Sequence, residues 1–113
     1  AHLLQEQGQY AEALATLALA TPDERDALRF HQLRGGLAQQ LKQWPLALES
    51  YQQLVSRAPS EGRYWLGLAL ASDGQADYPH AVQAFSRALA LEGLSPAARS
   101  YAQQRLGQLE GKP

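Results

Sequence analysis

The sequence predicts an all-α protein built from repeated helix pairs, and three observations carry that prediction. An aromatic residue begins a similar segment at Tyr10, Trp44 and Tyr78, and both intervals are 34 residues. Each segment continues with a small residue three positions on and a large apolar residue four positions later, which places them on one helix face. These pairs are Ala13 and Leu17, Ala47 and Tyr51, and Ala81 and Phe85. No segment shows the alternation of a strand, and a fixed period of this length is typical of stacked repeats.

Composition limits the chain to one folded domain, residues 1–113. Hydrophobic residues make up 45% and charged residues 19%, which is ordinary for a globular protein. Ten basic and eleven acidic residues give a net charge of −1 without a block of either sign, so the surface offers no footprint for nucleic acid or anionic lipid. Its apolar runs are too short to span a bilayer. Because cysteine is absent, disulfides, thiolate metal sites and cysteine nucleophiles are excluded.

The first half of the chain predicts three helices. A short one covers residues 1–7 and ends before Gly8, and a second covers residues 9–20. The third covers residues 22–40: Thr21 is in a capping position, Pro22 is at the first helical position and Glu24 stands where a capping box requires it.

The second half predicts four more helices. One begins at Trp44-Pro45 and ends before Pro59, and another, capped by Ser60, covers residues 61–72. The next covers residues 78–91. The last covers residues 96–109, with Ser95 as its cap and Pro96 in its first turn.

Several positions in each unit resemble the tetratricopeptide repeat family. Tyr64-Trp65-Leu66-Gly67 with Tyr78, Ala81, Phe85, Ala88 and Leu91 looks like one complete repeat, and a second contains Phe30, Leu33, Gly35, Trp44, Ala47, Tyr51, Leu54 and Pro59. The resemblance implies a right-handed superhelix of antiparallel helix pairs, with a partial repeat at 1–20, repeats at 22–59 and 60–92, and a capping helix at 95–109. When the last repeat is aligned on Leu66-Gly67, it has two extra residues in the turn between its two helices, around Ala76-Asp77. The alignment of the helix at 22–40 with the family pattern can be shifted by one residue, because either Leu33 or Arg34 could precede the small position of the pattern.

A narrower resemblance concerns the C-terminal half. The runs Tyr64–Ala71, Ala84–Leu91 and Gly93-Leu94-Ser95, followed by Arg99-Ser100-Tyr101, look like the C-terminal domain of MshN-type proteins of type IV (MSHA) pilus biogenesis. That resemblance implies a periplasmic domain of an inner-membrane-anchored bacterial protein, with a cytoplasmic domain as the alternative. Because the chain begins at Ala1 without methionine, we expect any signal or anchor to lie upstream.

The residues give no catalytic or metal-binding pattern. His2, His31 and His80 are scattered without metal-ligand spacing, and no serine lies in a nucleophile elbow. Beside His80, Asp77 is expected to cap a helix. We therefore predict no enzyme activity, no metal and no cofactor.

The family resemblance implies a concave groove formed by the first helix of each pair. Its positions carry over to His31, Gly35 and Gln39 (or one residue later), Tyr64, Leu68 and Ser72, and Tyr101, Gln104 and Gln108. Among the aromatic residues, Trp44, Tyr51, Trp65, Tyr78 and Phe85 are expected in the core, and Tyr64 and Tyr101 are expected to be exposed contact residues.

Two functions follow from this pattern. In the first, the chain is a scaffold that binds a protein or peptide partner in its groove during assembly of a bacterial envelope or pilus complex. In the alternative, it is a structural module that forms homo-oligomers through its end faces. Neither needs nucleic acid or membrane contact by this part of the protein.

Overall fold

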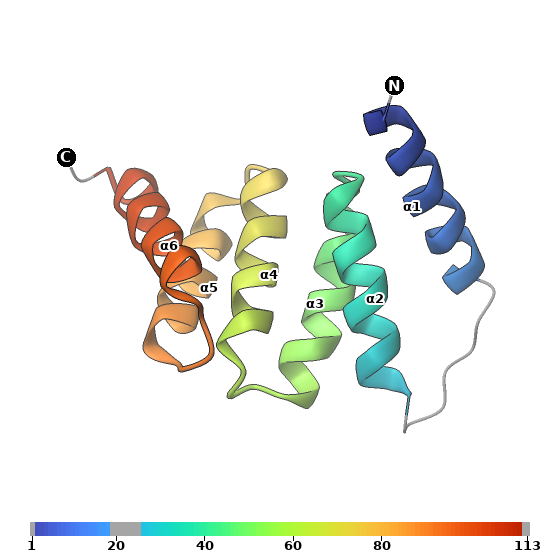
Figure 1. Cartoon of the computed structure of the whole chain (residues 1–113). Coiled ribbons are helices and arrows are strands. Elements are labelled where there is room, and N and C mark those ends of the chain that lie inside the picture. Colours follow the sequence, from blue (N-terminus) through green and yellow to red (C-terminus); the bar gives the residue numbers. More distant parts are fainter. Residues whose placement is uncertain (1, 19–25, 112–113) are drawn as a thin grey trace.

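The computed structural model describes residues 2–18 and 26–111, and within them the protein contains helices joined by short turns and no strand. It consists of α1 (His2–Ala18), α2 (Ala27–Gln40), α3 (Trp44–Arg57), α4 (Gly62–Gly74), α5 (Tyr78–Ala90) and α6 (Pro96–Leu109). The helices form one row in chain order and alternate in direction, with α2, α4 and α6 on the near side and α3 and α5 behind them (Figure 1). This arrangement gives a body of 44 × 38 × 25 Å.

The first helix differs from its prediction. Residues 2–18 form one continuous helix through Gly8, where two helices were expected. A Cβ on Gly8 would meet no other atom within 4 Å, and Gly8 does not have the positive φ that ends a helix. A helical glycine costs about 1 kcal/mol relative to alanine, which is less than the cost of nucleating two short helices. The predicted helix start at Thr21-Pro22 lies outside the described residues.

The 34-residue period is visible in the backbone of the turns. The turn between α2 and α3 has Lys42 at φ 57°, and the turn between α4 and α5 has Ala76, 34 positions later, at φ 60°. Gln43 N–H donates to the Ala38 carbonyl at 2.8 Å, and Asp77 N–H donates to the Ser72 carbonyl at 2.9 Å, again 34 positions later. Both turns therefore have the same length, and the expectation of two extra residues in the second one is wrong.

Small buried residues allow the helices to approach. Ala47 and Ala81, which are 34 positions apart, are both completely buried, whereas Ala13 is exposed. One core cluster consists of Ala38, Ala47 and Ala71. The other surrounds Phe85, whose side chain is also completely buried. Because the alanine side chain ends at Cβ, these residues let the helix backbones come close together, and the aromatic residues fill the remaining space.

The predicted cap at the start of α6 is confirmed. The Ser95 hydroxyl accepts a hydrogen bond from Ala98 N–H at 3.1 Å, and Pro96 occupies the first turn. At the start of α4, in contrast, Ser60 is not the cap: Glu61 occupies that position and makes no side-chain capping bond.

Replacing Ser95 by alanine is therefore expected to lower the free energy of unfolding by about 1 kcal/mol, since one N–H of the first turn loses its acceptor. Urea denaturation followed by circular dichroism measures this change. Ser60→Ala is the control, for which we expect a change within about 0.5 kcal/mol. Equal effects of the two substitutions would contradict the assignment of the cap.

Candidate functional site

A broad depression of the described surface lies among α2, α4 and α6. Its volume is about 560 Å³, within the range of ordinary ligand sites. Residues from four helices line it: Gln39 from α2, Trp44 from the start of α3, Leu70, Asp73 and Gly74 from α4, and Tyr101, Gln104, Arg105 and Gln108 from α6. We call this depression the α2/α4/α6 groove.

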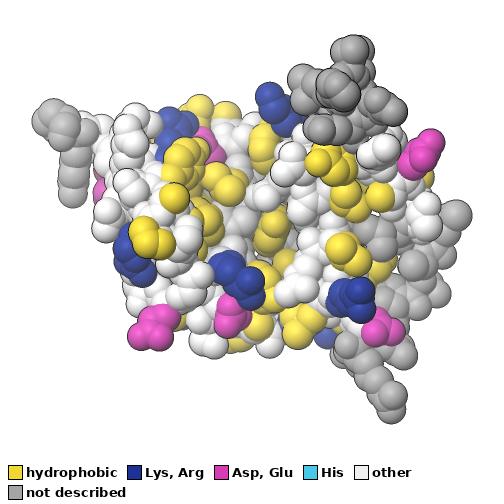
Figure 2. Space-filling view, viewed as in Figure 1, with side chains coloured by type: hydrophobic (Ala, Val, Ile, Leu, Met, Phe, Trp, Pro, Cys, Tyr) yellow, Lys and Arg dark blue, Asp and Glu magenta, His cyan; other side chains and the backbone are white. Residues whose placement is uncertain are grey.

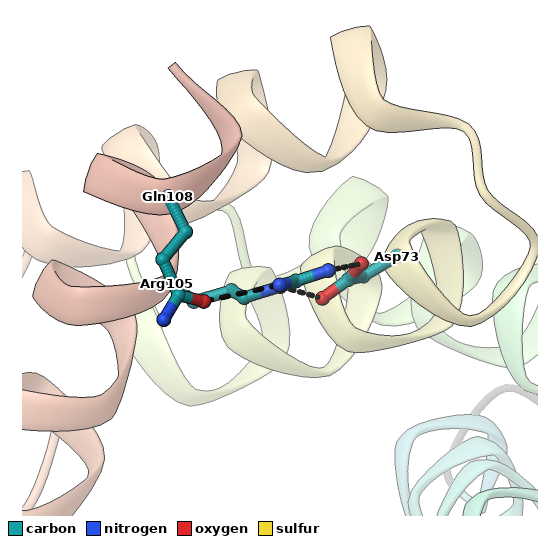
Figure 3. A network of polar contacts seen from close by, with 3 residues as sticks. All are labelled: Asp73, Arg105 and Gln108. Carbon is teal, nitrogen blue, oxygen red and sulfur yellow. Dashed lines mark hydrogen bonds and ion pairs between the residues drawn. The ribbon is translucent and has the colours of Figure 1, made fainter. Parts of the chain in front are cut away.

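An ion pair between α6 and α4 forms part of the wall (Figure 3). Arg105 donates from Nε to Asp73 Oδ2 at 2.7 Å and from Nη2 to Oδ1 at 2.8 Å. Its Nη1 donates to Gln108 Oε1 at 3.1 Å. The Asp73 side chain is only 12% exposed and that of Arg105 31%, so the pair is partly shielded from water. Hydrogen bonding to this carboxylate raises the pKa of Arg105 above its usual range.

On the opposite wall, the Gln39 carboxamide has a defined orientation. Its Oε1 accepts from the Tyr51 hydroxyl at 3.2 Å, and its Nε2 donates to the Gly67 carbonyl at 3.4 Å. These bonds use one of its two N–H donors and one of its two lone pairs. Among the described residues the remaining donor and lone pair have no partner, so they are available to a ligand.

Two aromatic residues complete the lining. Trp44 is half-buried, and a Cβ on Gly74 would lie 2.6 Å from its Nε1, so the indole lies flush against the end of α4. Tyr101 is 47% exposed, and its ring centroid is 6.3 Å from that of the buried Phe85. The predicted exposure of Tyr101 is thus confirmed. On this face of the molecule, hydrophobic side chains lie between scattered basic and acidic ones (Figure 2).

The structure brings four of the nine predicted groove residues together: Gln39, Tyr101, Gln104 and Gln108. The other five lie elsewhere. Gly35 is buried beneath Tyr51, with its Cβ position 3.0 Å from Tyr51 Cε2.

Tyr64 was expected to be exposed, but the residue is buried, with only 8% of its surface accessible. Its hydroxyl accepts a hydrogen bond from Gln32 Nε2. Tyr78 shows the opposite error: it was expected in the core and is 45% exposed.

Leu68 and Ser72 line a separate depression between α3, α4 and α5, with a volume of about 270 Å³. The reason is the register of α4. Because both turns have the same length, Gln39 corresponds to Asp73, which is 34 positions later, and not to Ser72. One residue along a helix turns the side chain by about 100°, which carries Leu68 and Ser72 to another face.

Sequence reasoning missed five residues of the groove: Trp44, Leu70, Asp73, Gly74 and Arg105. The interval from Gln39 to Asp73 could have identified Asp73. No pattern in the sequence pairs Asp73 with Arg105, since they are 32 positions apart and on helices of different repeats.

No group of three or more metal-binding side chains occurs among the residues that the structure describes. Asp77 precedes α5, but its carboxylate bonds to His80 Nδ1 at 2.7 Å and makes no capping bond to the backbone. This pair is well exposed, with 42% and 71% of the two side chains accessible. It also lies in the depression of Leu68 and Ser72, outside the groove.

His31, another predicted groove residue, packs edge-on against Phe30 with ring centroids 5.2 Å apart. Its Nδ1 is buried without a hydrogen-bond partner among the described residues. Burial lowers the pKa of His31, and the neighbouring Arg34 and Arg57 lower it further against the opposing effect of Glu49. The folded state therefore favours the neutral imidazole over the protonated one.

We expect the free energy of unfolding to fall as the pH is lowered below about 6.5, because the unfolded chain then binds a proton that folded His31 does not. The loss continues until the pH reaches the lowered pKa of the folded state. Urea denaturation of the wild type and of His31→Leu at about pH 7.5 and about pH 5.5 tests this. The variant is expected to lose less stability between the two pH values. An identical loss in both proteins would contradict a lowered pKa of His31 in the folded state.

No protein-family model, no curated protein and no solved structure matches this chain. Within the described residues, no helix is long and apolar enough to cross a membrane.

Proposed function

We propose that this chain is a protein–protein interaction scaffold of the tetratricopeptide type, which binds a peptide segment or a partner subunit in the α2/α4/α6 groove. The observation that carries the proposal is the groove itself: it is open, it is lined by side chains of three successive near-side helices, and it presents carboxamides and aromatic rings. Such surfaces recognise chains through hydrogen bonds and apolar contacts. The 34-residue repeat in both sequence and turn geometry supports the family assignment.

The partner we propose belongs to a bacterial envelope or type IV pilus assembly, with this domain in the periplasm. Support for this narrower proposal comes from the resemblance of Tyr64–Ala71 and Ala84–Leu91 to MshN-type proteins.

The test is capture of partners from a bacterial envelope extract on the immobilised chain, with quantitative mass spectrometry. The informative variant is Tyr101→Ala with Gln104→Leu, because both side chains line the groove and are exposed. Tyr64→Ala is unsuitable, since Tyr64 is buried and its loss would disturb the fold. Gln103→Leu, an exposed neighbour outside the groove lining, is the matched control.

We expect pilus-assembly proteins to be retained by the wild type and by the control and lost from the double variant. Retention of the same proteins by all three would refute the groove as the binding surface. If the proteins that bind the wild type but not the double variant are unrelated to the envelope, the pilus assignment is refuted and the groove stands.

Self-association is the second candidate. From the sequence it was expected at the end faces, but the exposed apolar side chains that favour it, Leu28 at 39% and Leu33 at 48%, lie on α2, which is not an end helix. Size-exclusion chromatography with light scattering separates the two functions. A monomer at every concentration would exclude self-association, whereas a dimer that Leu33→Gln dissociates would establish it.

A further inference from the structure

We propose that the α2/α4/α6 groove binds an uncharged peptide segment in extended conformation. Its backbone amides would pair with the carboxamides of Gln39 and Gln108, and an apolar side chain would contact Tyr101 and Trp44. This inference rests on the proposed function and specifies the class of partner.

Carboxamides face the groove from both sides. Gln39 on α2 is held by Tyr51 and Gly67 and retains one donor and one lone pair. Gln108 on α6 is oriented by Arg105, which occupies its Oε1 and leaves both N–H donors of its Nε2 for a ligand. A carboxamide, which can both donate and accept hydrogen bonds, is complementary to a peptide unit, which has one N–H donor and one C=O acceptor.

The conformation of the ligand follows from the same chemistry. A helical ligand uses its backbone donors and acceptors internally, so it would leave these carboxamides without partners. An extended ligand presents its N–H and C=O groups outward and can satisfy them.

The charge of the ligand follows from the ion pair. Asp73 and Arg105 are the only charged residues that line the groove within the described part of the chain, and they neutralise one another through two hydrogen bonds. An acidic group entering the groove would meet a guanidinium already bonded to a carboxylate and to Gln108. A basic group would meet a carboxylate already bonded to Arg105. Neither charge gains a free counterion to offset its loss of hydration.

The apolar contact comes from two helices. Tyr101 on α6 is 47% exposed. Trp44 at the start of α3 is half-buried and lines the same groove. Aromatic rings gain binding energy from apolar area at little cost in side-chain entropy, which suits them to hold a leucine, proline or aromatic side chain of the ligand.

The experiment uses synthetic peptide libraries of about ten residues, which reach about 33 Å when extended, close to the 38 Å dimension of the molecule. Three libraries share a central leucine, proline or phenylalanine and differ only in their flanking residues: serine, threonine and glycine in the first, added aspartate and glutamate in the second, and added lysine and arginine in the third. Affinity of the whole chain for the best members is measured by fluorescence anisotropy in physiological salt.

We expect the tightest binding from the uncharged library. Gln108→Leu should weaken it about fivefold, and Tyr101→Ala about tenfold. Gln103→Leu, on the same helix but outside the groove lining, should leave the affinity unchanged. Replacing the peptide unit that contacts Gln108 by a trans-alkene removes the carbonyl that accepts from Gln108 Nε2–H. It should weaken binding to the wild type by the same factor as Gln108→Leu, and should have no further effect on that variant. Thermal unfolding of each variant shows whether the fold is intact.

The outcomes separate this inference from the proposed function. Tightest binding of acidic or basic peptides, lost in Tyr101→Ala, would overturn the uncharged class and leave the scaffold function standing. Equal effects of Gln103→Leu and Gln108→Leu would overturn the backbone pairing. No binding from any of the three libraries would overturn this inference. Capture of envelope proteins that is lost in the variant Tyr101→Ala with Gln104→Leu would then leave the scaffold function standing, and absence of such capture would overturn both.

Discussion

Replacing Gly67 by alanine is expected to lower the free energy of unfolding by about 3 kcal/mol. A Cβ on Gly67 would lie 2.5 Å from Tyr51 Cζ and closer still to two other atoms of that ring. The ring has little room to move aside, because its other edge lies close to the backbone of Gly35 on α2, where an added Cβ would be only 3.0 Å from Tyr51 Cε2. Overpacking of this kind costs about 1–3 kcal/mol, and displacement of the Tyr51–Gln39 hydrogen bond adds to it. Chemical denaturation followed by circular dichroism measures the change.

Gly36→Ala is the matched control. Gly36 is also within a helix, but its Cβ position has no atom within 4 Å. We expect this substitution to stabilise the protein by about 1 kcal/mol, because alanine reduces the conformational freedom of the unfolded chain. If Gly67→Ala were as stable as Gly36→Ala, the close contact between α3 and α4 would be disproved. Gly67→Ala combined with Tyr51→Leu is expected to be more stable than Gly67→Ala alone, because the smaller side chain makes room for the methyl group.

A second contact between an aromatic residue and a glycine joins the same two helices. Trp44 and Tyr51 are seven positions apart on α3, and they face Gly74 and Gly67, seven positions apart on α4. Seven residues are close to two helical turns, so the two aromatic residues share one face and the two glycines share the opposing one. Because Trp44 also lines the groove, this seam connects the packing of the repeats to the shape of the binding surface.

Replacing Arg105 by glutamine is expected to destabilise the protein by about 2 kcal/mol, the second-largest effect. The substitution removes both hydrogen bonds to Asp73, whose carboxylate is only 12% exposed and would lose its counterion. Hydrogen bonds to charged groups contribute about 1.5–3 kcal/mol each, and partial exposure of Arg105 reduces the total. Arg105→Lys is expected to recover only part of the loss, since an ammonium group cannot bind both carboxylate oxygens in the same plane.

A double-mutant cycle with Asp73→Asn isolates the pair. The double variant is expected to be more stable than the sum of the single effects predicts, because neither partner is then left as an unpaired charge. Arg63→Gln serves as the exposed comparison: its 3.4 Å ion pair with Glu61 is well accessible, and we expect a change within about 0.5 kcal/mol. Equal effects of Arg105→Gln and Arg63→Gln would show that the Asp73 pair does not hold α6 to α4.

Periodicity and local chemistry were sufficient to predict much of the fold. The proline-containing first turns of α3 and α5, the Ser95 cap of α6 and the absence of strands from the described residues all agree with the structure. Gly8 was misinterpreted because a glycine can end a helix or lie within one, and the choice depends on its neighbours and not on its identity.

The candidate groove was harder to predict than the fold. Of the residues that the sequence grouped together, Gln39, Tyr101, Gln104 and Gln108 line the same depression. In α4 an apparent two-residue insertion led to the wrong register. Leu68 and Ser72 were therefore predicted to line the groove, although they lie on another face of the helix. An alignment of motif letters cannot distinguish adjacent helix positions when both carry small or apolar residues.

The sequence by itself determined the helical class, the 34-residue repeat and most helix boundaries, because these depend on backbone preferences and on the spacing of apolar residues within one segment. Only the tertiary structure decided which faces meet. The insertion of Tyr51 between Gly35 and Gly67, and the pairing of Asp73 with Arg105, join residues 16 to 32 positions apart. Their partners are chosen by the fit of side chains across helices, and that fit depends on the relative rotation of whole helices, which no single segment encodes.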